Sequence, residues 1–123
     1  MAASPILYGG NLAHTSEEEF ALLTNEQALA CNRNGITGKR IYGERFIDIW
    51  KTPSRMGDEH GWLGIFNRKG KDYSFSIPLQ ALQLPKGVRA ADLKDIWTGR
   101  KLDIRGDKVF WDMKIAECCF LAY

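Results

Sequence analysis

The hydrophobic and polar positions follow three different patterns along the chain. Residues 2–8 form a short apolar run that stops at Gly9 and Gly10. A continuous apolar run bounded by glycines is typical of a buried strand in a parallel sheet. The pattern therefore indicates a strand over residues 4–10. Because nothing before it can pair with it, we expect this segment to be disordered, to dock on the rest of the chain or to pair with another chain.

Residues 15–35 carry the signals of helices. Ser16 is followed three positions later by Glu19, which is the pattern of a capping box at a helix N-terminus. The stretch Thr24-Asn25-Glu26-Gln27 repeats this pattern, so a kink or a second short helix is predicted to begin there. Gly35 follows the last helical positions and provides a C-terminal stop.

From about residue 39 the period becomes two, as expected of strands with one buried face. Segment 62–66 is apolar throughout, which is typical of a central strand covered on both faces. Short strands separated by glycine-containing turns predict a mainly β fold, an antiparallel β-sandwich of Greek-key type with six to eight strands. A short strand and one or two helices precede this sandwich. The change of period near Gly38 divides the chain into residues 1–37 and 38–123.

Composition and charge exclude several kinds of partner. The chain has 123 residues, of which 45% are hydrophobic and 26% charged, as in ordinary globular domains. The net charge is +2 and the basic residues are scattered, so we expect no nucleic-acid partner. No apolar stretch approaches the length of about 18 residues that a membrane span needs, so no membrane partner is expected. The residues given contain no signal-peptide pattern, and the cellular compartment stays undecided.

The cysteines do not form a recognisable site. Cys31, Cys118 and Cys119 are odd in number and lack the spacing of a disulfide framework. Neighbouring cysteines on a strand point to opposite faces, so the last two are poorly placed to share one ion. We interpret all three as small buried hydrophobic residues and predict neither a metal site nor a cofactor.

No catalytic residue is predicted. The chain lacks a nucleophile elbow, a phosphate-binding glycine loop and a zinc-protease motif. The densest group of titratable residues, at 57–61, is interpreted as an exposed hairpin loop. Asp95 and Asp112 lie in strand patterns, where an aspartate more often accepts backbone N–H groups than acts as an acid or base.

Aromatic residues are the candidates for ligand binding, because aromatic faces pack against the C–H faces of sugar rings. All of them have apolar neighbours in strand patterns, so burial in the core is the competing and preferred interpretation. Carbohydrate binding requires that at least two of them are exposed in a line or a cleft. The carbohydrate-binding candidates are Trp50, Trp62, Trp97, Trp111 and Tyr73.

A series of motifs resembles one enzyme family. In chain order, the stretches are SPILYGGNL (4–12), LLTNEQALA (22–30), NRN (32–34), WK (50–51), GWLGIFNR (61–68) and DIWTG (95–99). They resemble the C-terminal third of the α-galactosidases (melibiases) of glycoside hydrolase family 27, and their order covers essentially the whole chain. Arg33 and Asn34 depart from the family's usual Gln and Asp, so the resemblance does not define the sugar substrate.

The resemblance has implications for architecture and catalysis. It implies that residues 1–37 are a remnant of the last βα unit of a (β/α)8 barrel and that residues 38–123 are the C-terminal β-sandwich domain. Family members are retaining enzymes whose barrels present two aspartates roughly 5–5.5 Å apart. A barrel takes about 200 residues or more, and no residue here matches either aspartate.

Three functions are compatible with these observations. The preferred one is an accessory, structural part of an α-galactosidase-like retaining glycoside hydrolase, without catalysis of its own, whose partner is the missing catalytic barrel. The second is a carbohydrate-binding module. The third is an interaction domain that forms a homo-oligomer through the bare, apolar surface that would otherwise face the barrel.

Overall fold

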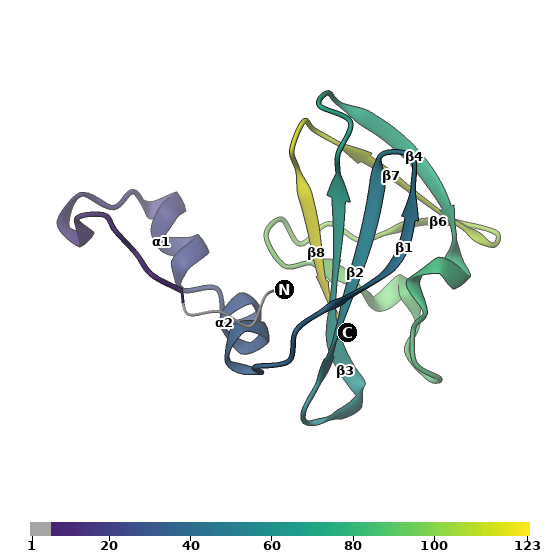
Figure 1. Ribbon diagram of the computed structural model, residues 1–123, viewed down its shortest axis with the longest axis horizontal. Helices are drawn as coiled ribbons and strands as arrows, with labels where there is room; N and C mark the ends of the chain where they lie inside the picture. Colours follow the sequence, from purple (N-terminus) through teal and green to yellow (C-terminus); the bar gives the residue numbers. More distant parts are fainter. Residues whose placement is uncertain (1–5) are drawn as a thin grey trace.

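Antiparallel strands form two sheets that pack face to face in the computed structural model, which describes residues 6–123 (Figure 1). One sheet has the strand order β1-β2-β3-β8-β5 and the other has the order β4-β7-β6. The strands are β1 (Lys39–Glu44), β2 (Ile47–Ser54), β3 (Gly57–Asn67), β4 (Tyr73–Pro78), β5 (Lys94–Asp95), β6 (Asp103–Arg105), β7 (Lys108–Met113) and β8 (Cys118–Ala122). The predicted antiparallel sandwich is confirmed.

Two short α-helices precede the sandwich, and three 3-10 turns complete the structure. These elements are η1 (Leu12–His14), α1 (Glu17–Leu23), α2 (Glu26–Arg33), η2 (Leu79–Leu82) and η3 (Ala90–Asp92). None of the described helices is long and apolar enough to cross a membrane.

The strand order follows from hairpins and crossings between the sheets. β1, β2 and β3 form a meander, after which the chain crosses to the second sheet for β4. It then places β5 at the far edge of the first sheet and returns for the β6–β7 hairpin. β8 finally enters the first sheet between β3 and β5, so the last strand lies beside one that is far away in sequence.

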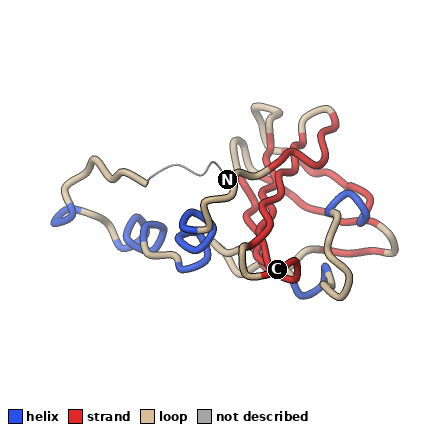
Figure 2. The backbone as a smooth tube through the Cα atoms, turned by 60° about the horizontal axis from the view of Figure 1, so that its bottom comes forward, coloured by secondary structure: helices blue, strands red, loops and turns tan. Residues whose placement is uncertain are grey.

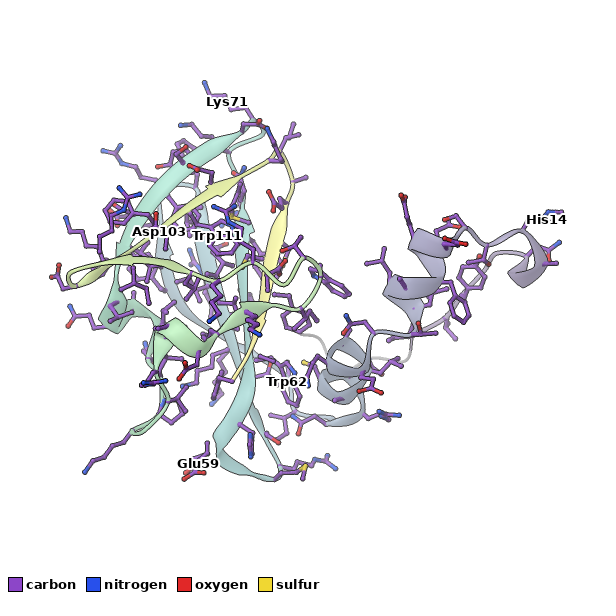
Figure 3. All side chains as sticks on the ribbon, turned by 180° about the vertical axis from the view of Figure 1, so that it is seen from behind. His14, Glu59, Trp62, Lys71, Asp103 and Trp111 are labelled. Atoms are coloured by element: carbon purple, nitrogen blue, oxygen red, sulfur yellow. The ribbon has the colours of Figure 1, made fainter. Side chains whose placement is uncertain are left out.

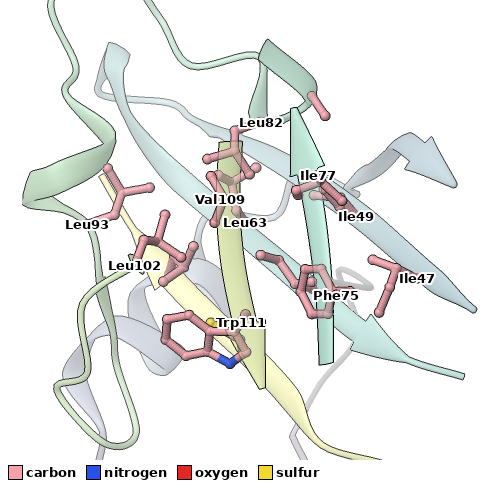
Figure 4. Close-up of a cluster of buried hydrophobic side chains, with 14 of the residues drawn as sticks. Ile47, Ile49, Leu63, Phe75, Ile77, Leu82, Leu93, Leu102, Val109 and Trp111 are labelled. Carbon is pink, nitrogen blue, oxygen red and sulfur yellow. The ribbon is translucent and has the colours of Figure 1, made fainter. Parts of the chain in front are cut away.

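The core lies between the two sheets and is built by the predicted alternation. In β4, Phe75 and Ile77 are buried while Ser74 and Ser76 are exposed, so one face of the strand enters the core. From the opposite sheet, Ile49 and Leu63 meet this layer, as the close-up shows (Figure 4). The other large, fully buried side chains of the core include Ile65, Leu82, Leu93, Val109, Met113 and Leu121.

The helices begin where the capping patterns predict. Ser16 caps α1: its backbone N–H donates to the Glu19 carboxylate (3.0 Å) and its hydroxyl accepts from the Glu19 N–H (3.2 Å). The second helix is a separate element whose N-cap is Asn25. Its side-chain oxygen accepts the N–H groups of Gln27 and Ala28, each at 3.1 Å. Because one amide oxygen satisfies two N–H groups, Asn25 caps the helix rather than the preceding Thr24.

The prediction of a buried strand over residues 4–10 is wrong for the part that the structure describes. Residues 6–10 form no strand, and Ile6, Leu7 and Tyr8 are exposed. Residues 4 and 5 lie outside the described residues. A buried strand needs neighbouring strands to pair its backbone groups, and the described chain brings none to this segment. Residues 6–23 instead form an arm that leads away from the sandwich (Figure 2).

The titratable group at 57–61 lies at the outer end of the β2–β3 hairpin. The turn itself is at positions 55–56, so Gly57–His60 begins β3 instead of forming the predicted loop. The pairing skips from Ser54–Gly57 to Pro53–Gly61, which leaves residues 58–60 as a bulge. These residues are exposed, as predicted.

Asp95 links β5 to the neighbouring strand β8 and to the turn that follows β5. Its buried carboxylate accepts the Phe120 N–H (2.8 Å), the Thr98 N–H (3.1 Å) and the Thr98 hydroxyl (2.6 Å). The sequence predicts this role for Asp95, in which a strand aspartate accepts backbone N–H groups. Asp112, by contrast, is exposed on β7.

A buried carboxylate also joins the first three strands. Asp48 on β2 accepts from Nε of Arg40 on β1 (2.8 Å) and from Nη1 of Arg68, which follows β3 (2.6 Å). Burial on its own would raise the pKa of the Asp48 carboxyl. The hydrogen bonds and the charges of the two guanidiniums outweigh burial and hold this pKa below its ordinary value.

We therefore expect Asp48→Asn to lower the free energy of unfolding near neutral pH by about 1.5–3 kcal/mol, because two charge-assisted hydrogen bonds are weakened. A depressed pKa contributes stability above the unfolded-state pKa of about 3.9, and this contribution disappears as the pH falls through the folded-state pKa. Urea unfolding at neutral pH and at a pH below this range should show the wild-type advantage shrinking on acidification. Asp112→Asn is the matched control and should change little; an Asp48→Asn effect that is independent of pH would contradict the prediction.

Candidate functional site

An aromatic row crosses the outer face of the five-stranded sheet, the face directed away from the three-stranded sheet. Trp50 on β2 is paired with Gly64 on β3, which is paired with Phe120 on β8. These positions alternate with core residues, so their side chains share the outer face. The Trp97 ring continues the line, with its centroid 6.0 Å from that of Phe120. We call Trp50, Phe120 and Trp97 the aromatic row.

The row is partly open to solvent. Trp50 is 36% exposed and Trp97 is 39% exposed, while Phe120 between them is half-buried. Adjacent strands lie about 4.8 Å apart, so the positions of Trp50 and Phe120 are separated by roughly 10 Å across the sheet. The structure thus brings together two of the five predicted candidates, in a line.

Of the other three candidates, the two tryptophans are buried and Tyr73 is partly buried. Trp62 is only 6% exposed, because α2 lies over it and its Nε1 donates to the Gln27 side chain (3.3 Å). Trp111 is 2% exposed within the sandwich. Figure 3 shows the first beside α2 and the second inside the sandwich. Tyr73 stacks on Phe75, and the Lys69 ammonium lies 3.9 Å from its ring centroid.

Helix α2 covers one end of the outer face and is tied to it at both termini. At its N-terminus, the Asn25 side chain donates to the Ile96 carbonyl (3.0 Å). At its C-terminus, Asn34 donates to the Pro53 carbonyl (2.9 Å) and accepts the Arg55 N–H (2.8 Å). The aromatic row lies beside this covered region.

The chemistry of the outer face is that of a contact surface. Asp48 borders the row, but two guanidiniums neutralise it, so it is not free to act as an acid or nucleophile. Burial raises the pKa of the Cys31 thiol, on the buried side of α2, and that of Cys118 on β8, the latter to about 11. These thiols stay protonated near neutral pH and are poor nucleophiles and metal ligands. In the described chain, no group of three or more potential ligand residues could hold a metal ion.

A groove of about 660 Å³ runs between α2 and the β2–β3 hairpin. Its polar lining includes Arg33, Arg55 and His60, and Tyr123 closes one side. The described lining contains no carboxylate, whereas glycoside hydrolysis uses a pair of them. This groove therefore lacks the groups for that reaction.

The arm is a second apolar surface. Its exposed side chains are Ile6, Leu7, Tyr8, Phe20 and Leu22, and α1 has no buried residue. A seven-residue helix is marginal unless it packs against something, because helix formation has a costly nucleus. The arm and the aromatic row are thus two apolar surfaces that lack cover within the described chain.

Phe120 was not among the predicted site residues. The stretch 118–122 is an apolar run, which indicates a buried strand but does not reveal its neighbours. Only the register between β3 and β8 places this ring beside Trp97 and opposite Trp50. The one weak signal for this site in the sequence is Gly64. It has no side chain, so the outer face is open between Trp50 on β2 and Phe120 on β8.

Comparisons with known proteins agree with the resemblance in the sequence motifs. No protein-family model matches the chain. Probable α-galactosidase A of Aspergillus terreus is 25% identical over 105 residues, or 85% of this chain and 20% of that protein. α-Galactosidase 2 of Arabidopsis thaliana is 26% identical over 102 residues, or 79% of this chain and 24% of that protein.

The fold also matches solved structures. The family 27 β-L-arabinopyranosidase of Geobacillus stearothermophilus aligns over 98% of this chain and 26% of its own, with a TM-score of 0.76 and 22% sequence identity. The chain spans only about a fifth to a quarter of the length of the curated relatives it matches. In sequence and in fold, this chain therefore resembles a fragment of an α-galactosidase-like glycoside hydrolase of family 27.

Proposed function

We propose that this chain is an accessory, structural part of an α-galactosidase-like retaining glycoside hydrolase and has no catalysis of its own. The observation that carries the proposal is the aromatic row, which lies uncovered beside a helix already seated on the same sheet face. A sheet with apolar residues on its outer face needs a covering layer. In the proposed parent protein, the catalytic (β/α)8 barrel is that layer.

The arm supports the same arrangement. In the proposal, residues 1–37 belong to the last βα unit of the barrel and residues 38–123 form the domain that packs on it. Leu7 and Phe20 on the arm, like Trp50 and Trp97 on the sandwich, are exposed here and would be buried in the parent. Each apolar Å² so buried stabilises the assembly by about 25 cal/mol.

The catalytic groups would then come from outside these residues. Hydrolysis with retention requires a nucleophilic carboxylate and an acid/base carboxylate facing one sugar from opposite sides. Near the aromatic row, Asp48 is paired with two arginines and Asp95 accepts three hydrogen bonds. Both carboxylates already have structural roles.

The purified chain should therefore not hydrolyse p-nitrophenyl α-galactoside. The assay compares release of p-nitrophenol with a buffer blank, using protein from a host that lacks its own galactosidase. An intact α-galactosidase is the positive control. Turnover well above the blank, in material shown free of other glycosidases, would overturn the assignment of a non-catalytic role.

A second candidate function is carbohydrate binding by the aromatic row. The observation in its favour is that Trp50 and Trp97 are both exposed and aligned. Pyranose rings could stack on these indoles as they do on other aromatic surfaces. In the accessory role proposed above, by contrast, the same rings pack against the barrel.

Tryptophan fluorescence separates these two functions. If the row serves to pack against the barrel, titration with galactose, melibiose or galactomannan oligomers should leave the tryptophan emission unchanged at millimolar sugar. A saturable change that is lost in the Trp50→Ala/Trp97→Ala variant, but kept in a variant of the partly buried Tyr73, would instead establish sugar binding at the row.

A further inference from the structure

Four strands of the sandwich lie at sheet edges, where backbone N–H and C=O groups point outward unless other parts of the chain cover them. They are β1 and β5 in the five-stranded sheet and β4 and β6 in the three-stranded sheet. Proteins protect such edges by keeping them short, by charging them, or by adding bulges and covering groups. An unprotected edge is a site where another strand can add.

Two of the four edges are too short or too charged to take a strand. β5 has only two residues, and its outer side is already paired, because the Asp95 N–H donates to the Arg100 carbonyl (2.8 Å) and Lys94 forms a β-bridge with Lys101. β6 has three, and two of these, Asp103 and Arg105, form an exposed ion pair at 2.7 Å. Both edges follow the usual pattern of protection.

The edge of β1 is protected in two further ways. Its pairing with β2 shifts register between Arg40 and Tyr42, so the strand is irregular. The Gln83 side chain, which follows η2, donates to the Ile41 carbonyl at 3.2 Å. A covering group thus occupies part of the open edge.

β4 lacks most of these protections, and only Pro78, at its last position, limits pairing. Its six residues, Tyr73–Pro78, carry no charge, and their pairing with β7 runs without a register shift. A cleft of about 310 Å³ opens along the strand, between Tyr73–Ile77 and the residues Tyr42, Glu44 and Arg45 of the neighbouring hairpin. Within residues 6–123, no other strand pairs with this side of β4.

We propose that the β4 edge pairs with β4 of a second copy of this chain, antiparallel, about a two-fold axis perpendicular to the sheet. This arrangement joins two three-stranded sheets into one continuous six-stranded sheet. A closed, isologous dimer of this kind is the commonest form of homo-oligomer.

Among the registers that set residues of the same face opposite each other, the one centred on Phe75 pairs Tyr73–Ile77 and leaves Pro78 outside these pairs. A perpendicular two-fold axis keeps core-facing residues on one side, so residues of the same face must meet. Centred on Phe75, this register sets Phe75 against its own copy and Tyr73 against Ile77. Ser74 then lies opposite Ser76 on the outer face. Aromatic, β-branched and Ser pairs of this kind stabilise antiparallel sheets.

The residues at the two ends of β4 also favour a second copy of this chain as the partner of the β4 edge. The same register sets the charged residues Lys71 and Asp72 opposite Leu79 and Pro78, so no like charges face each other. Pro78 lacks an N–H, but it stands at the end of the strand, where its effect on the ladder is smallest.

This interface is independent of the proposed docking surface. β4 belongs to the three-stranded sheet, whereas the aromatic row lies on the outer face of the five-stranded sheet, in the other layer (Figure 1). Both surfaces can therefore be occupied at once, and the failure of one proposal would leave the other standing.

The test is the oligomeric state of the purified chain, measured by sedimentation equilibrium. Wild type should form a dimer. Ser74→Lys with Ser76→Lys places lysine opposite lysine twice and should weaken the dimer about tenfold or more. Ser74→Lys with Ser76→Glu is the matched control: the same register places lysine opposite glutamate, so the dimer should be kept. Far-UV circular dichroism and urea unfolding verify that each variant is folded.

Several outcomes would overturn the proposal. These are a wild-type monomer at the highest concentration reached, a Lys/Lys variant that dimerises as tightly as wild type, or a folded Lys/Glu variant as weak as the Lys/Lys one. Trp50→Ser with Trp97→Ser should leave the β4 dimer intact. Loss of the dimer only in this last variant would assign self-association to the outer face and contradict pairing through β4.

Discussion

Both faces of the five-stranded sheet are apolar over its central strands, and each face must therefore be kept from water. Ile49, Leu63 and Leu121 fill the inner face, which the three-stranded sheet covers. Trp50 and Phe120 lie on the outer face, which only α2 covers, and then only at one end. The second sheet covers one face of the five-stranded sheet, and α2 covers only part of the other; a further partner is what we propose for the rest of that face.

This constraint explains features that would otherwise seem unrelated. Side-chain hydrogen bonds from Asn25 and Asn34 to backbone groups of the sandwich hold α2 in one position on the sheet. Preceding it, α1 and the arm expose apolar side chains because nothing in the described chain packs on them. The proposed role as part of a larger hydrolase would give both uncovered surfaces the same physical reason.

The sequence predicts local structure well where that structure depends only on residues close by in the chain. The Ser16 capping box, the break before α2 and the alternation in β4 all depend on neighbours within a few positions, and the structure confirms them. The continuous apolar segment 62–66 also indicates correctly a central strand with little exposure on either face.

Properties that depend on distant pairing could not be predicted. Trp50 and Trp62 lie in similar apolar surroundings in the sequence, yet α2 covers only the second. The apolar run at 4–10 has the composition of a buried strand, but composition does not supply neighbouring strands, and residues 6–10 form none. Likewise, the aromatic row exists only because β8 enters the sheet beside β3, which no local pattern specifies.

The central claim is that the aromatic row is a surface made to be covered by a catalytic barrel. Hydroxyl-radical footprinting tests it on this chain alone and on the chain joined to the barrel of Arabidopsis α-galactosidase 2, in place of the residues it matches. Trp62 and Trp111 are buried in either case and serve as internal controls. Trp50 and Trp97 should be oxidised readily in the isolated chain and protected in the joined protein; equal oxidation in both would contradict the account.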